Sequence, residues 1–153
     1  MATYRSRYLT PLLAVTVLTG FLAGGRSAAV ATGDGDRWPM KRETNESRVL
    51  HDISRVDLHA AMSELARRHS VRMARRDRLF HVSNPPAYYL DGIRWSTWGE
   101  NVGYTTGTVE GLQRLFMKSP PHRANILNRR FKRVAIGTVR RDGRLWVTVF
   151  FYG

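Results

Sequence analysis

The sequence predicts an α+β fold in which helices cover both faces of a mainly antiparallel sheet, giving a three-layer α-β-α sandwich. Three patterns support this prediction: apolar residues at helical spacing after Val56, a second helical stretch that begins at Thr108, and a hairpin that closes the chain. Helices followed by a buried hairpin are typical of such layered architectures.

The first two patterns have the three- and four-residue spacing of amphipathic helices. Between Leu58 and Met73 the apolar side chains alternate with arginines, and Asn84-Pro85-Pro86 is expected to end this region because proline lacks a backbone donor. A second helix is predicted from its N-cap Thr108 to Lys118. A short third helix, with proline in its first turn, is predicted from Ser119 to Leu127.

The closing hairpin runs from Val134 to Val139, turns at Asp142-Gly143 and returns from Leu145 to Tyr152. The returning strand is apolar at successive positions, so both of its faces are expected to be buried. This strand is therefore predicted to lie inside the sheet, with a helical layer on each side.

The N-terminal residues are typical of an export signal. Arg5 and Arg7 supply positive charge, an apolar run extends from Leu12 to Ala23, and Ala29-Val30-Ala31 fits a cleavage motif. The run has about a dozen residues, whereas a membrane span needs about twenty. We expect residues 1–31 to be a signal peptide, residues 32–45 a polar linker, and residues 46–153 the single domain of a secreted, extracellular protein.

The chain is strongly basic and contains no cysteine. Its net charge of +13 falls to +10 when the three arginines of the signal peptide are removed. The lack of cysteine excludes disulfides, zinc–thiolate sites and thiol nucleophiles. The charge has two interpretations, which are a solvated basic surface or attraction to anionic envelope polymers. The basic residues nearest the hairpin are Arg129, Arg130, Lys132 and Arg133.

Four stretches of the chain carry a family resemblance. They are residues 66–74, which lead to His81; Gly99-Glu100-Asn101-Val102; residues 116–127, which contain His122; and the closing hairpin. In this order they resemble the cysteine-rich secretory protein, antigen 5 and pathogenesis-related (CAP, or SCP) superfamily, in its cysteine-free bacterial form. The resemblance implies an α-β-α sandwich with a central cleft.

In that superfamily the cleft is lined by two histidines and one or two glutamates. The matching residues here are His81, His122 and Glu100. The second glutamate of many eukaryotic members falls at Ser119, so this chain is expected to have one carboxylate in its cleft. The segment before Ala60 is shorter than in most members, which predicts a thin outer layer there.

Two imidazoles and a carboxylate suit zinc or another divalent cation, with His81 and His122 as the metal ligands. Structural roles are the alternatives: His81 held by a helix C-terminus, Glu100 bonded to backbone N–H groups, and His122 bonded locally near the start of its helix. The remaining histidines are expected on the surface or on a helix face: His51, His59 and His69.

These features give one expected function and two alternatives. We expect a secreted, monomeric CAP-domain protein whose cleft binds a small or lipid-like ligand, with or without a divalent metal and without established catalysis. The first alternative is a metal-assisted hydrolase with Glu100 as general base, although no His-Glu-x-x-His segment is present. The second is a basic adhesion module that binds anionic envelope polymers, without specific nucleic-acid contacts.

Overall fold

A computed structural model describes residues 34–153 of the chain, so the predicted signal peptide lies outside the described residues. The elements in chain order are η1 (Asp34–Asp36), α1 (Arg37–Val49), β1 (Asp57–Leu58), α2 (Ala60–Arg75), α3 (Pro85–Tyr89), β2 (Trp98–Thr105), α4 (Val109–Lys118), α5 (Pro120–Ile126), β3 (Arg133–Arg141) and β4 (Arg144–Tyr152). Within these residues, no helix has the length and apolar character needed to cross a membrane.

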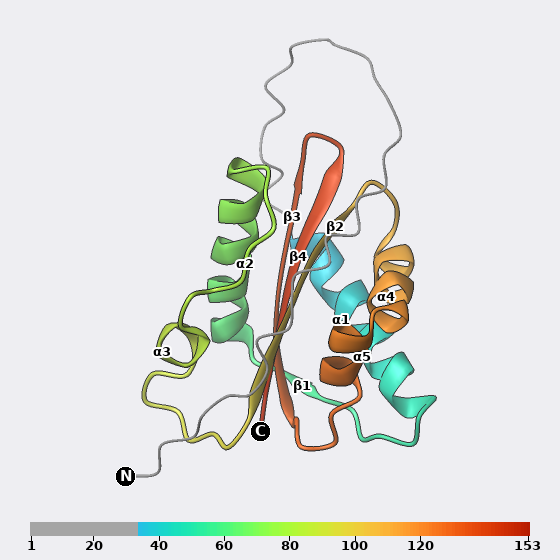
Figure 1. The fold of residues 1–153 in the computed structure, drawn as a ribbon, viewed down its shortest axis with the longest axis vertical. Coiled ribbons are helices and arrows are strands. Elements are labelled where there is room, and N and C mark those ends of the chain that lie inside the picture. Colours follow the sequence, from blue (N-terminus) through green and yellow to red (C-terminus); the bar gives the residue numbers. More distant parts are fainter. Residues whose placement is uncertain (1–33) are drawn as a thin grey trace.

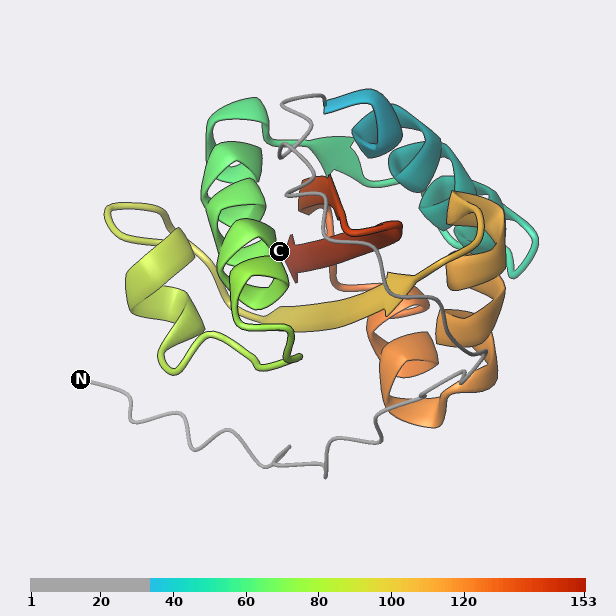
Figure 2. The same cartoon turned by 90° about the horizontal axis from the view of Figure 1, so that it is seen from above.

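The four strands form one sheet in the order β1-β3-β4-β2, in which only the short β1 pairs in parallel. Figures 1 and 2 show α2 and α3 on one face of this sheet and α1, α4 and α5 on the other. The predicted three-layer α+β sandwich with a mainly antiparallel sheet is therefore confirmed. Strand β2 forms an edge of the sheet, and this position determines where the site lies.

Strand β4 supplies apolar side chains to the cores on both faces of the sheet, as its sequence predicted. Leu145, Val147, Val149 and Phe151 pack with α1, α4 and α5, whereas Trp146 and Phe150 pack on the α2 side. The turn before β4 has positive φ at Asp142 (49°) and Gly143 (72°), as a two-residue hairpin of the right twist requires. All residues of β4 except its first are buried.

Helix α2 packs directly on β3 because small residues let the two backbones approach. A Cβ atom at Gly137 would lie 2.0 Å from backbone atoms of Ala66 and Arg67, so only glycine fits there. The hydroxyl of Ser70 lies 2.9 Å from the Gly137 carbonyl oxygen and donates to it. These contacts fix the height of α2 above the sheet, and with it the start of the following loop.

The prediction of a linker over residues 32–45 is wrong from Arg37 onward, because helix α1 begins there and packs as part of the domain. Its buried face is mostly polar, so no apolar period marks it in the sequence. Asn45 exchanges hydrogen bonds with the backbone of Val56, at 2.8 and 3.1 Å. Arg48 is fully buried and donates to the carbonyl oxygens of Ser54, Ile126, Asn128 and Phe131.

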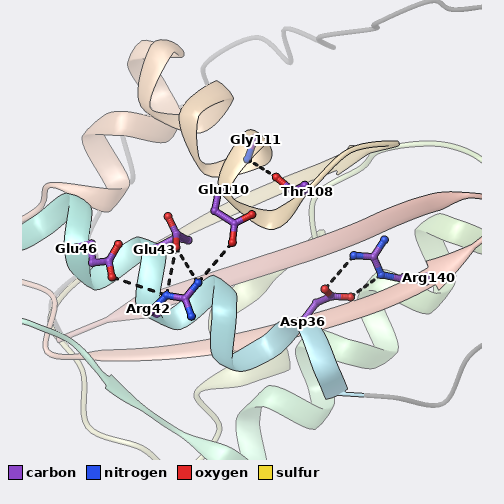
Figure 3. A network of polar contacts seen from close by, with 8 residues as sticks. All are labelled: Asp36, Arg42, Glu43, Glu46, Thr108, Glu110, Gly111 and Arg140. Atoms are coloured by element: carbon purple, nitrogen blue, oxygen red, sulfur yellow. Dashed lines mark hydrogen bonds and ion pairs between the residues drawn. The ribbon is translucent and has the colours of Figure 1, made fainter.

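The outer layer before Ala60 is consequently not thin, because α1 fills it. Exposed ion pairs also connect α1 and the preceding η1 with other elements (Figure 3). Arg42 reaches Glu110 of α4 at 3.4 Å, and Asp36 accepts two bonds from Arg140 of β3 at 2.7 and 2.9 Å. Exposed pairs of this kind add little stability each, so the buried polar face carries most of the attachment.

The predicted end of the first helical region, at Asn84-Pro85-Pro86, is also wrong. Helix α2 stops at Arg75, well before Asn84, and a loop of irregular backbone follows it. Asn84 then caps the short helix α3, accepting a hydrogen bond from the Ala87 N–H at 3.3 Å. Pro85 and Pro86 occupy the first turn of α3, where their missing donors cost nothing.

We predict that Trp146→Ala lowers the free energy of unfolding by about 3–5 kcal/mol, because the side chain is buried in the core. The matched control is Trp38→Ala on α1, whose side chain is 61% exposed and whose loss is expected to cost about 0.5 kcal/mol or less. Urea denaturation measures both values. Similar small losses in the two variants would contradict the assignment of β4 as an interior strand.

Candidate functional site

The Gly-Glu-Asn segment lies on the edge strand β2, and its side chains alternate between the two faces of the sheet. Gly99 allows close packing, since a Cβ there would lie 2.4 Å from the side chain of Asn125. Asn101 points to the same face, where it donates to the His122 carbonyl oxygen at 3.0 Å and accepts from Asn125 at 2.8 Å. Glu100 points to the opposite face, toward the loop that follows α2.

The Glu100 carboxylate is buried and accepts three hydrogen bonds. Oε1 accepts from His81 Nδ1 at 2.8 Å and from the Val82 N–H at 3.1 Å, and Oε2 accepts from the Tyr89 hydroxyl at 3.1 Å. Its side chain is 2% exposed. Burial, and then the neighbouring Glu100, raise the pKa of Tyr89, so the phenol stays protonated as a donor. An ionised carboxylate is an acceptor only, which matches these three donors.

The predicted association of His81 with Glu100 is therefore present in the structure. His81 lies six residues beyond the last residue of α2, so the alternative role at a helix C-terminus does not apply. Because the carboxylate accepts a hydrogen bond from Nδ1, this nitrogen carries the proton. Nε2 is then the ring nitrogen that is available to a ligand. The side chain of His81 is 44% exposed, so its ring is accessible to a ligand.

His69 lies on helix α2 and belongs to the site, although it was expected to be an ordinary surface or helix-face residue. It is fully buried, and its Nε2 lies 2.8 Å from the Phe80 carbonyl oxygen, next to His81. Its ring also packs on the Phe80 ring, with centroids 5.1 Å apart. Burial lowers the pKa of His69 to about 4, although the nearby Glu100 opposes this shift. A neutral His69 therefore helps to position the loop that carries His81.

The other two histidines outside the matched set have local roles. His59 caps α2, where its Nδ1 accepts from the Met62 N–H at 3.1 Å. His51 is exposed, as expected, and its Nδ1 lies 2.8 Å from the Ser47 carbonyl oxygen.

His122 lies at the third position of α5, as predicted, and its ring packs on Phe116 with centroids 4.9 Å apart. Burial, and then the charge of the nearby His81, lower the pKa of His122 to about 4. The two imidazoles therefore lie within electrostatic range of each other. They line different hollows, however, and no hydrogen bond connects them.

The larger hollow is an open pocket of about 540 Å³ beside His81, between the end of α2 and α3. It is lined by Arg72, Arg76, Phe80, His81, Val82, Ser83, Asn84, Ala87 and Tyr88. The smaller is a slot of about 30 Å³ beside His122, with otherwise mostly apolar walls. A slot of that size holds about one water molecule or methyl group, so a ligand body fits only the larger pocket.

A closed metal site is not formed by the residues described. Among them, no group of three or more histidine, cysteine, aspartate or glutamate side chains is arranged to hold a metal ion. Both oxygens of Glu100 already accept hydrogen bonds, so this carboxylate orients His81 rather than acting as a ligand. His81 and His122 remain the two donors that could share an ion, with water completing its coordination.

We predict that Glu100→Ala lowers the free energy of unfolding by about 3 kcal/mol, because the buried Tyr89 hydroxyl and the partly buried His81 and Val82 N–H groups lose their acceptor. Glu100→Gln is expected to cost less, about 1–2 kcal/mol, because its amide oxygen still accepts and Tyr89 can turn to accept from its NH₂ group. Glu46→Gln, at a largely exposed carboxylate, is the control and should change little. Equal stability of the Glu46 and Glu100 variants would show that the cluster does not hold the loop.

A second prediction concerns pH. The pKa values of His69 and His122 in the folded protein lie near 4, below the reference value of 6.5, so the unfolded chain binds more protons between pH 6.5 and 4. The free energy of unfolding should therefore fall as the pH decreases through this window, by up to about 3 kcal/mol from the fully buried His69. Urea titrations at several pH values measure this slope. His69→Gln and His122→Gln should each flatten it, and an unchanged slope in both variants would contradict the prediction.

The family model described as the cysteine-rich secretory protein family (CAP) matches residues 41–151. Protein YkwD of Bacillus subtilis (strain 168) is 30% identical over 112 residues, which cover 70% of this chain and 43% of the relative. The chain therefore spans less than half the length of that relative.

Solved structures show the same fold at low sequence identity. An extracellular protein containing an SCP domain from Bacillus anthracis is 22% identical, with a TM-score of 0.60 over 75% of this chain and 39% of the other. An outer surface protein from Borrelia burgdorferi is 12% identical, with a TM-score of 0.70 over 81% of this chain and 96% of the other. A cysteine-rich secretory protein from Staphylococcus aureus is 19% identical, with a TM-score of 0.64 over 81% and 40%. With its matched region, its fold and its lack of cysteine, this chain belongs to the CAP family in the cysteine-free form.

Proposed function

We propose that this CAP-domain protein binds a small amphipathic, lipid-like ligand in the open pocket beside His81, and that it does so without catalysis. The single observation that supports this most strongly is the state of Glu100, whose two oxygens already accept three hydrogen bonds. A general base needs a free oxygen within reach of the proton it removes. Both oxygens of Glu100 are engaged and its side chain is only 2% exposed, so a substrate proton does not reach it, and a binding role is favoured over the metal-assisted hydrolase.

The chemistry of the pocket wall indicates the class of ligand. Phe80, Val82, Ala87 and the Tyr88 ring offer apolar surface, and the same wall carries polar groups from Arg72, Arg76, His81, Ser83 and Asn84. Largely apolar pockets with a few convergent polar groups are typical of small-molecule sites. An apolar body with a polar end would match both parts of this wall.

We predict that a dansyl-labelled fatty acid binds this pocket with increased fluorescence. Ala87→Trp should weaken the binding by about tenfold or more, because the indole would occupy the space of the ligand. Ala61→Trp, at an exposed position of α2 away from the pocket, is the matched control and should bind as the wild type does. Equal binding by both tryptophan variants would place the ligand elsewhere, and no binding by any would oppose the proposal.

A divalent cation is a second candidate ligand, favoured by the bond from His81 Nδ1 to Glu100. A carboxylate that fixes one ring nitrogen commonly orients the other toward a metal. Zinc held by His81 and His122 would supply a Lewis acid. The low pKa of His122 keeps its imidazole neutral, and therefore able to coordinate, in mildly acidic solution.

For this second candidate, calorimetric titration with zinc should give saturable binding to the wild type. His81→Ala and His122→Ala should each remove most of it, because a site of two imidazoles depends on both ligands. Glu100→Gln should weaken binding less, since it alters only the orienting group. His59→Ala and His51→Ala serve as controls with one imidazole removed. Zinc uptake that persists in both cleft variants and disappears in the controls would move the site to His51 and His59.

We also propose that the protein is exported and that the mature chain begins at Thr32. The proposal is supported by the signal-like N-terminus and by relatives of the same fold that are described as an extracellular protein and an outer surface protein. Outside the cell, a basic protein with a net charge of +10 would also be attracted to anionic envelope polymers.

A further inference from the structure

The pocket beside His81 contains two arginines whose hydrogen-bonding groups are free. Arg72 lies in the last turn of α2 and Arg76 is its C-cap, so one helical turn separates the two. Both line the pocket. Within residues 34–153 neither guanidinium has an ion-pair or hydrogen-bond partner, whereas Arg48, Arg140 and Arg144 are all bonded to oxygen atoms.

Aromatic rings hold these two guanidinium groups in place. The Arg72 guanidinium lies 4.9 Å from the Tyr88 ring centroid, and that of Arg76 lies 5.2 Å from the Phe80 ring centroid. The rings are fixed in turn, because the Tyr88 hydroxyl donates to the Leu65 carbonyl oxygen and the Phe80 carbonyl is bonded to His69. A guanidinium that packs by its face keeps its in-plane N–H donors free for an oxygen ligand.

The surrounding charges favour an anion. The pocket lining contains no acidic side chain, and it adds the hydroxyl of Ser83 and the amide of Asn84 as donors. Asn84 uses its side-chain oxygen to cap α3, which leaves its NH₂ group available. The last turn of α2 carries partial negative charge, which favours arginine there, but two full positive charges exceed it. The Glu100 carboxylate, bonded to His81, is buried and already accepts three bonds, and Asp77, next to Arg76 in the chain, is paired with Arg144.

We infer that Arg72 and Arg76 form a binding site for a phosphate group, carried as a phosphate ester by the ligand of this pocket. Two forked cations and two neutral donors suit a tetrahedral group with several oxygens better than the two oxygens of a carboxylate. The inference rests on the proposed function, because the phosphate would be the polar end of the ligand whose apolar part contacts Val82, Ala87 and Tyr88.

The test is calorimetric titration of the full mature chain with inorganic phosphate, at an ionic strength held constant with sodium chloride. The double variant Arg72→Gln/Arg76→Gln should lower the affinity by about tenfold or more, since it removes charge-assisted hydrogen bonds. The control is Arg68→Gln/Arg75→Gln, which removes the same charge from exposed positions of the same helix outside the pocket. Its affinity should stay within about twofold of the wild type.

An equal loss in the two double variants would overturn the inference and assign the binding to the basic surface as a whole. The absence of saturable phosphate binding to the wild type would also overturn it. If phosphate does not bind while the dansyl-labelled fatty acid binds and Ala87→Trp weakens that binding, only this inference is lost. If both probes fail, the proposed function is lost with it.

Two further probes distinguish the source of the phosphate. In the first, the protein is sedimented with phosphatidylglycerol or phosphatidylcholine vesicles. Binding to phosphatidylglycerol alone, if it is lost in Arg72→Gln/Arg76→Gln, supports the site and identifies a lipid headgroup. The second probe is glycerol 3-phosphate. If it binds saturably, if the same variant loses this binding and if the protein does not sediment with vesicles, the result supports the site and identifies a soluble ester. Vesicle binding that survives in the variant contradicts a role of these arginines in lipid recognition.

Discussion

The cleft depends on one buried carboxylate, because the loop that carries His81 has no regular secondary structure to hold it. This loop follows α2, and two of its residues, His81 and Val82, are bonded to Glu100. His69 secures the adjoining Phe80 from the side of α2. The position of His81 therefore follows from side-chain hydrogen bonds in a buried setting, where each unpaired donor is costly. On the opposite face of the same strand, Asn101 fixes α5 and with it His122.

The elements that the sequence predicted correctly are those with strong local signals. Thr108 caps α4 as expected, the prolines after Ser119 start α5, and Asp142-Gly143 forms the hairpin turn. Apolar residues at successive positions marked the interior strand, because both of its faces meet the apolar sides of helices. The family resemblance placed Glu100 with His81, although no pattern of spacing alone could bring two residues so far apart in the chain into contact.

The features that were missed depend on distant partners. The buried face of α1 includes Asn45 and Arg48, and such residues indicate a linker until the backbone groups that they bind are known. His69 is indistinguishable in sequence from an exposed helical histidine, because its burial is set by Phe80 and the covering loop. Likewise, the sequence left open whether Glu100 is a base or an anchor. The three donors that converge on it favour the anchor.

The bond between His81 and Glu100 can be observed directly. Nitrogen-15 NMR of the imidazole rings in mildly alkaline solution reports which ring nitrogen of His81 carries the proton. The structure predicts a proton on Nδ1, held by the Glu100 carboxylate, with an unprotonated Nε2 facing the pocket. In Glu100→Ala this preference should be lost. A proton found on Nε2 in the wild type would contradict the view that Glu100 positions His81 for ligand binding.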